Sequence, residues 1–264
     1  MENNQIPEEG YQEENLAVQK SKDEPSTSGK IASFLSILER AINDWRKNLR
    51  KFVEIYLWGI YYSLIPLAVG MVFIFLSRTT DLTLIKAVAA ITSFVAIVVL
   101  IYFFIQAYVG MFIFLKKDFQ GSAKESFKEA RPFIWPYFWL ALLTGVLILL
   151  WALLLIIPGV IFSVYYSFAV YVFFFEEKKG MEAIKRSKQL VKGYWWPVAG
   201  RILGFSLLVW LFMMLVSIPG MMAVEDSWFW NFWNVITEII SYLIGPIAML
   251  FSYTIYKDLV NIKK

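Results

Sequence analysis

The stretch 180–197, GMEAIKRSKQLVKGYWWP, determines the architecture that we predict for the rest of the chain. Its small and apolar residues recur at helical spacing and therefore share one face; they are Ala183, Ile184, Ser187, Leu190 and Val191. The positions between them carry Lys185, Arg186, Lys188, Gln189 and Lys192. An apolar stripe with basic flanks suits a membrane surface. The pattern predicts a short amphipathic helix whose stripe faces the membrane.

The end of this stretch predicts where the helix stops and how the chain enters the bilayer. Gly193 is placed to end the helix, because glycine adopts the left-handed conformation at a helix C-terminus without steric cost. Trp195 and Trp196 follow, and indole rings favour the level of the lipid head groups. Pro197 then opens an apolar segment.

A similar pattern occurs 61 residues earlier in the chain. Lys124 and Ser126 correspond to Lys185 and Ser187, and the pair Trp135-Pro136 corresponds to Trp196-Pro197. Pro158-Gly159 likewise corresponds to Pro219-Gly220, so uncommon pairs keep one register across a whole apolar span. The register predicts a structural duplication, with 31–51 as a looser third copy. Each unit would be one amphipathic helix followed by two spans, and such copies are parallel repeats.

The composition is that of a membrane protein. Of 264 residues, 59% are apolar and 18% aromatic, while only 17% are charged. The chain has no cysteine and no histidine, which excludes disulfides, thiolate metal sites, cysteine nucleophiles, imidazole catalysis and His-ligated metals within it. We predict no cofactor and no metal.

The expected fold class is all-α: a polytopic helical bundle of six transmembrane helices with cytoplasmic interfacial amphipathic helices. Residues 1–30 are acidic and poor in apolar side chains, which predicts a disordered cytoplasmic tail. Residues 31–264 form the membrane domain. A helix needs about 20 apolar residues to cross a bilayer, and the spans expected on that basis are 52–76, 87–115, 133–156, 160–175, 196–218 and 235–256.

Two connections between the spans have their own predictions. Pro158-Gly159 leaves almost no loop between the third and fourth spans, which predicts a tight hairpin. The segment 221–234 is rich in Trp and Phe, which predicts an external loop at the outer interface. A ligand-binding aromatic box is the alternative for that loop.

The distribution of basic residues predicts the orientation. Most Lys and Arg residues lie in the segments 30–51, 116–131, 178–192 and 257–264, whereas the opposite loops contain only Arg78 and Lys86. By the positive-inside rule, both termini and both long basic loops are cytoplasmic.

Few polar side chains fall within the apolar spans. Glu54 stands one turn from Arg50 and Lys51, which predicts an ion pair. Gln106 is expected to form a hydrogen bond with a neighbouring helix. Arg201 lies one turn after Pro197 and is expected to reach lipid phosphate or a carboxylate, and Glu238 lies near the outer end of the sixth span.

These groups predict no catalytic site, because Glu54 and Arg201 belong to one side of the membrane and Glu238 to the other. The sequence has no glycine-rich phosphate loop and no serine-centred elbow. We therefore predict a protein that is not an enzyme. Nucleic acid is not expected as a partner, because the basic residues alternate with an apolar stripe.

The pattern formed by Gly180, Ala183, Ile184, Ser187, Leu190, Gly193 and Trp196, followed by Ile-Pro-Gly, resembles a group of bacterial six-span membrane proteins. The group includes the YciC-like family and the membrane domain found beside glycerophosphodiester phosphodiesterases. In the latter, catalysis belongs to a separate soluble domain, and we do not expect this sequence to encode it, because it contains no His and no long soluble segment. The resemblance covers about residues 35–260 and implies a bacterial inner-membrane location.

The leading functional hypothesis is contact with anionic lipid, or with a membrane-protein partner, through the basic interfacial helices. The candidate contact residues are Lys185, Arg186, Lys188, Lys192, Trp195, Trp196 and Arg201. A plainer reading is that these residues only anchor and orient the bundle. The alternative function is a transporter or permease-like subunit for a small or lipidic solute, suggested by parallel repeats and by proline-glycine breaks near span ends.

Overall fold

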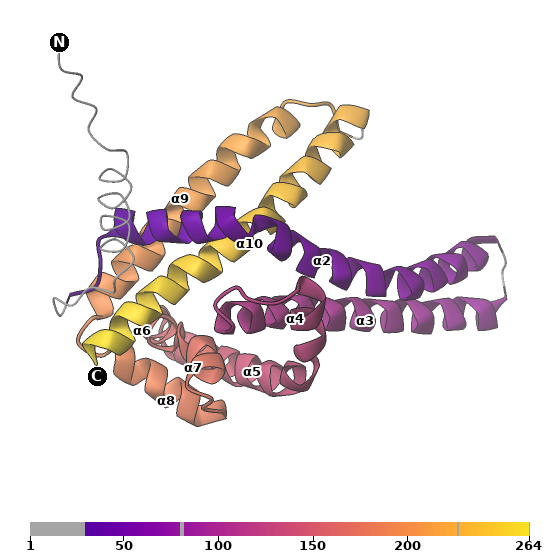
Figure 1. The fold of residues 1–264 in the computed structure, drawn as a ribbon. Helices are drawn as coiled ribbons and strands as arrows, with labels where there is room; N and C mark the ends of the chain where they lie inside the picture. The colour runs from indigo at the N-terminus through magenta and orange to yellow at the C-terminus, as the bar shows by residue number, and fades with distance from the viewer. Residues whose placement is uncertain (1–29, 80–81, 226, 264) are drawn as a thin grey trace, which may run out of the picture. The chain divides into compact units, whose positions relative to one another are not determined.

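The computed structural model describes residues 30–79, 82–225 and 227–263, and within these ranges the regular structure is entirely helical (Figure 1). The predicted tail lies outside them except for Lys30. The helices are α2 (Phe34–Thr79), α3 (Thr83–Lys116), α4 (Ala123–Glu129), α5 (Arg131–Leu154), α6 (Ile156–Tyr166), α7 (Ala169–Phe175), α8 (Gly180–Val191), α9 (Trp195–Met221) and α10 (Trp228–Ile262).

Six helical segments in the described ranges are long and apolar enough to cross a membrane, with α6 and α7 together forming the fourth. The predicted all-α polytopic membrane fold is thus confirmed. One element was predicted wrongly: the amphipathic helix 31–51 and the span 52–76 are not separate but form the single 46-residue helix α2. No Gly or Pro stands between Phe34 and Trp58, so nothing in that stretch interrupts the helix.

The tight hairpin between the third and fourth spans is confirmed. Leu155, with extended backbone (φ −160°, ψ 139°), is the only residue between α5 and α6. Trp151 stacks on Phe162 across the hairpin with ring centroids 4.1 Å apart. A Cβ added at Gly159 would lie 2.8 Å from both Cα and Cβ of Ala152, so only glycine allows this approach.

The predicted external loop 221–234 is shorter in the structure. Helix α9 continues to Met221, and α10 already begins at Trp228. The hydroxyl of Ser227 accepts a hydrogen bond from the Trp230 N–H at 3.1 Å, which caps the N-terminus of α10. Trp228, Phe229, Trp230, Phe232 and Trp233 therefore belong to the first turns of a helix and not to a loop.

The described residues divide into two compact units. Unit 1 comprises the described residues up to Arg46 and from Leu190 onward, and unit 2 comprises those of Lys47–Gln189. These boundaries fall inside α2 and α8, so they do not coincide with the boundaries of the predicted two-span repeats.

Unit 2 has an aromatic core at one end of its helices. The buried residues of α3 gather mainly from Gln106 to Leu115, near its C-terminus. Phe112 stacks on Phe174 of α7 at 4.8 Å, and Tyr62 of α2 stacks on Phe127 of α4 at 5.7 Å. Away from this core the spans expose apolar side chains, as expected of helices that face lipid.

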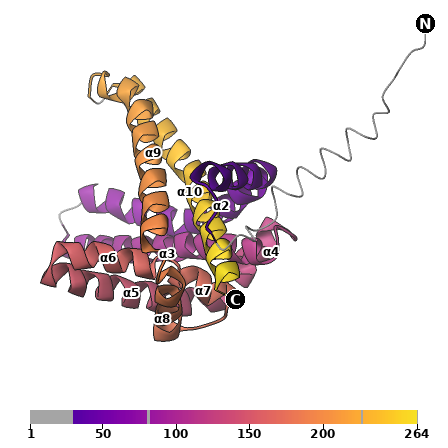
Figure 2. The same cartoon turned by 90° about the vertical axis from the view of Figure 1, so that its left-hand side faces the viewer.

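Unit 1 is organised on the antiparallel pair α9–α10, whose helices run side by side in Figures 1 and 2. Phe205 of α9 stacks on Phe251 of α10 with ring centroids 4.5 Å apart. Phe34, at the start of α2, meets the edge of the same Phe251 ring at 5.6 Å. This aromatic trio holds the N-terminal turn of α2 on the α9–α10 pair.

Candidate functional site

The segment 180–197 forms α8 and the start of α9, and the predicted helix end is present. Gly193 has φ +89°, the left-handed conformation expected of it. The orientation of the apolar stripe differs from the prediction. Ala183, Ile184, Ser187, Leu190 and Val191 are all at most 2% exposed within the chain. The stripe faces protein and not the membrane, because α8 uses it for packing.

Ser187 joins α8 to a break in the fourth span. Between α6 and α7 the helix is interrupted, with Phe168 at φ −100°, ψ 5°. The Ser187 hydroxyl donates to the Tyr165 carbonyl at 2.7 Å and accepts from the Phe168 N–H at 3.2 Å. One buried hydroxyl thus serves a carbonyl and an N–H on the two sides of the break.

The basic residues of α8 have different surroundings. Arg186 Nε donates to both carboxylate oxygens of Glu176, at 2.9 and 3.2 Å, so its charge is already paired within unit 2. The Lys188 ammonium lies 5.1 Å from the centroid of the Phe162 ring. Lys185, Lys188 and Lys192 are exposed. The residues that present charge outward are therefore these three lysines.

The segment after α8 contains the two tryptophans and Arg201. Trp195 and Trp196 meet edge to face at 4.7 Å, and Trp196 is 80% exposed. Arg201 donates to the carbonyls of Ala32 (2.6 and 3.0 Å), Ile31 (3.1 Å) and Pro197 (2.8 Å). The sequence predicted that Arg201 contacts lipid phosphate or a carboxylate, whereas its hydrogen-bond partners among the described residues are neutral carbonyls.

Asp258 was missed by sequence reasoning. Its Oδ2 accepts the Ala32 N–H at 2.9 Å and the residue is 1% exposed, so Asp258 and Arg201 bind the same dipeptide before α2. Its position offered one signal: Asp258 follows Phe251 and Thr254 at helical spacing, on the buried face of α10. An acid on an apolar face indicates a buried partner.

The other polar candidates have separate partners. Glu54 accepts from Arg50 Nε at 2.9 Å, as expected for the predicted ion pair, and Gln106 donates to the Phe127 carbonyl at 2.8 Å, as expected for a helix-to-helix bond. Both belong to unit 2, whereas Glu238 is exposed on α10 in unit 1. Glu54 also lines a cleft of about 780 Å³ with Trp58, Tyr61, Tyr62 and Lys124.

The described ranges contain no group of three or more His, Cys, Asp or Glu residues that could hold a metal ion. Comparison of the chain with protein-family models, curated proteins and solved structures finds no match. The resemblance to the YciC-like proteins therefore stays a prediction that rests on the residues quoted above.

Proposed function

We propose that this integral membrane protein binds anionic phospholipid at the cytoplasmic leaflet through α8, without catalysis. The observation that supports the proposal is the arrangement of α8 itself. Its apolar face is buried against protein while Lys185, Lys188 and Lys192 stay exposed. A helix held in this way presents its charges at a constant position, and basic residues near an anionic leaflet favour anionic head groups.

The test replaces the three exposed lysines together by glutamine. Arg186 is left intact, because its loss would leave Glu176 without one of its partners. At up to about 1 kcal/mol per charge, the variant should lose up to about 3 kcal/mol of preference for anionic lipid. The measurement is the ratio of phosphatidylglycerol to phosphatidylcholine that the full-length protein retains from bilayers containing both lipids equally.

The matched control replaces the same lysines by arginine. This variant keeps the charges and the cation–π contact of position 188, so it should retain the wild-type ratio. Salt should weaken the preference in the wild type, because exposed charges are screened within about 8 Å at physiological ionic strength. An unchanged lipid ratio in the glutamine variant refutes the proposal.

The alternative is a transporter or permease-like subunit, and the Glu54 cleft of unit 2 is the feature that favours it. The cleft combines a carboxylate, aromatic rings and the Lys124 ammonium, which lies 4.8 Å from the Trp58 ring centroid. A zwitterionic or lipidic solute would suit such walls. Reconstituted vesicles that show no flux of labelled amino acids or lipids, and no change with Glu54→Gln, would exclude this alternative.

A further inference from the structure

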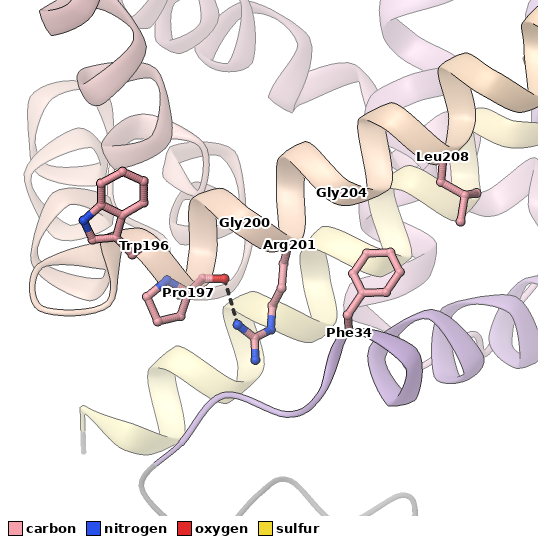
Figure 3. Close-up of a pocket in the computed structure, with 7 residues that line it drawn as sticks. All are labelled: Phe34, Trp196, Pro197, Gly200, Arg201, Gly204 and Leu208. Atoms are coloured by element: carbon pink, nitrogen blue, oxygen red, sulfur yellow. Dashed lines mark hydrogen bonds between the residues drawn. The ribbon is translucent and has the colours of Figure 1, made fainter.

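A second surface with lipid-binding chemistry lies in unit 1, along one side of α9. It is a groove of about 450 Å³ lined by Phe34, Trp196, Pro197, Gly200, Arg201, Gly204 and Leu208 (Figure 3). The groove exists because two glycines, one turn apart, leave α9 without side chains there. A Cβ at Gly200 would meet nothing within 4 Å, whereas a Cβ at Gly204 would lie 3.4 Å from the Phe34 ring.

The groove changes from charged to apolar along α9 between Arg201 and Leu208. Figure 3 shows Trp196 and Pro197 toward one end, Arg201 and Phe34 in the middle, and Leu208 toward the other. From Arg201 to Leu208, α9 rises about 10 Å at 1.5 Å per residue. The predicted topology places the Trp196 end nearer the cytoplasmic head groups. The change from charge to hydrocarbon along the groove thus follows the direction of a lipid in the inner leaflet.

The guanidinium in this groove is fixed in place and retains capacity for a ligand. Of its five N–H groups, the hydrogen bonds to Ala32, Ile31 and Pro197 use four, and one at Nη1 has no partner among the described residues. The described residues also place no carboxylate within 4.0 Å of it; Asp258 binds the Ala32 N–H instead. An anion can therefore approach Arg201 without displacing an ion pair.

The apolar wall opposite α9 is also held in position. The Phe34 ring meets the Phe251 ring edge to face, and Phe251 stacks on Phe205. Arg201 donates hydrogen bonds to the carbonyls of Ile31 and Ala32, which fixes the position of the backbone directly before Phe34. Since both walls are fixed by bonds within unit 1, the groove does not depend on a ligand for its shape.

We propose that this groove is a stoichiometric site for one anionic phospholipid, with its phosphate at Arg201 and one acyl chain along Gly200, Gly204 and Leu208 against Phe34. This site is distinct from the α8 surface, which attracts anionic head groups in general and contains none of the residues that line the groove. Within a bilayer, apolar contact alone does not favour one lipid over another. Retention here rests on shape fit and on the guanidinium.

The decisive variant is Gly200→Leu, which places a side chain in the groove at a position where an added Cβ meets nothing within 4 Å. The matched control is Gly145→Leu in α5 of unit 2, where an added Cβ also meets nothing within 4 Å. Full-length protein is delipidated, supplied with phosphatidylglycerol, and the bound lipid is counted by native mass spectrometry. We expect the wild type and Gly145→Leu to retain one lipid and Gly200→Leu to lose it.

Two further arms establish which part of the lipid is bound. Phosphatidylcholine should be retained about fivefold less than phosphatidylglycerol, the equivalent of one charge contact near the membrane. Excess inorganic phosphate should not displace the lipid, because phosphate lacks the chain that fills the groove. Displacement by phosphate would show a simple anion site and overturn the lipid assignment.

A measurement on the wild type covers the case in which Gly200→Leu does not fold. Phosphatidylglycerol with a photoreactive acyl chain should label α9 or the first turn of α2, at residues that line the groove. Labelling confined to other spans overturns the proposal. So does an equal lipid count in wild type and Gly200→Leu, or a Gly200→Leu variant that loses a dimer instead of a lipid, which would identify a second copy as the occupant.

Discussion

The two segments related by the 61-residue shift, 124–159 and 185–220, share their landmark residues but differ in local structure. In the first, the helix breaks at Leu155 and Pro158-Gly159 starts the returning helix; in the second, α9 runs unbroken through Pro219-Gly220. Both glycines nevertheless lie against the other helix of their hairpin. The shared residues thus correlate with where two helices approach closely, and not with whether a helix continues.

The largest expected effect comes from adding a methyl group at the first of these two glycines, Gly159. At Gly159 the new Cβ would lie 2.8 Å from Cα of Ala152, and backbone cannot move aside cheaply. Gly159→Ala should therefore destabilise the protein by about 3 kcal/mol, the upper part of the range for overpacking. The measurement is the free energy of unfolding in mixed detergent, with circular dichroism monitoring the loss of helix.

At Gly220 the nearest atom is Cδ1 of the Trp233 side chain, also at 2.8 Å. That ring can shift, but its Nε1 donates to the Val216 carbonyl at 2.7 Å and would lose this bond. Because Ala also gains about 1 kcal/mol over Gly in a helix, Gly220→Ala should cost about 1 kcal/mol or less. Gly145→Ala, in open space, is the control and should be neutral or stabilising. Equal losses at positions 159 and 220 would contradict the distinction between backbone and side-chain neighbours.

The corresponding serines provide the second prediction. Ser187 bonds to both sides of the α6–α7 break, whereas the buried Ser126 hydroxyl has no hydrogen-bond partner among the described residues. Ser187→Ala should cost about 2 kcal/mol, since it removes a hydrogen-bond partner of a part-buried carbonyl and of a buried N–H. Ser126→Ala should be neutral or stabilising by up to about 1 kcal/mol, because it removes a desolvated hydroxyl.

Thermal denaturation of the two serine variants in the same detergent measures this difference. Ser187→Thr is a useful third variant, because it keeps the hydroxyl while adding a methyl group. If Ser126→Ala destabilises the protein as much as Ser187→Ala, the two serines contribute equally to stability. That result would contradict the difference predicted here and would support the predicted repeat.

The sequence was sufficient to predict the class of fold, because long apolar segments and proline-glycine pairs are local features. The six spans, the α5–α6 hairpin and the end of α8 at Gly193 all depend on such features. The Arg50–Glu54 pair could also be predicted, since i,i+4 spacing on a helix brings the two side chains together.

What the sequence could not supply were contacts between residues distant along the chain. Arg201 bonds to Ala32 across 169 residues, and Asp258 reaches the same residue across 226. The apolar stripe of α8 could equally face lipid or protein, because both environments accept Ala183 and Ile184. Only tertiary packing shows that it faces protein, and that Ser187 belongs to the α6–α7 break.

The smallest predicted effect concerns Lys116 and Glu177, which occupy corresponding positions of the same 61-residue register and bind each other at 2.7 Å. The hydrogen bond from Lys116, reinforced by its charge, lowers the pKa of Glu177 below its ordinary value of 4.5. Since the folded pKa is the lower one, the pair stabilises the protein above about pH 4.5, and this contribution is lost as the pH falls through the lowered pKa.

Lys116→Gln should therefore lower the melting temperature slightly at pH 7, and the difference should vanish in acid. Glu177→Gln should resemble Lys116→Gln at pH 7. The effect should be small and salt-sensitive, because water and ions screen an exposed pair. A difference that persists undiminished in acid would assign the stabilisation to the alkyl chain of Lys116 and not to the charge pair.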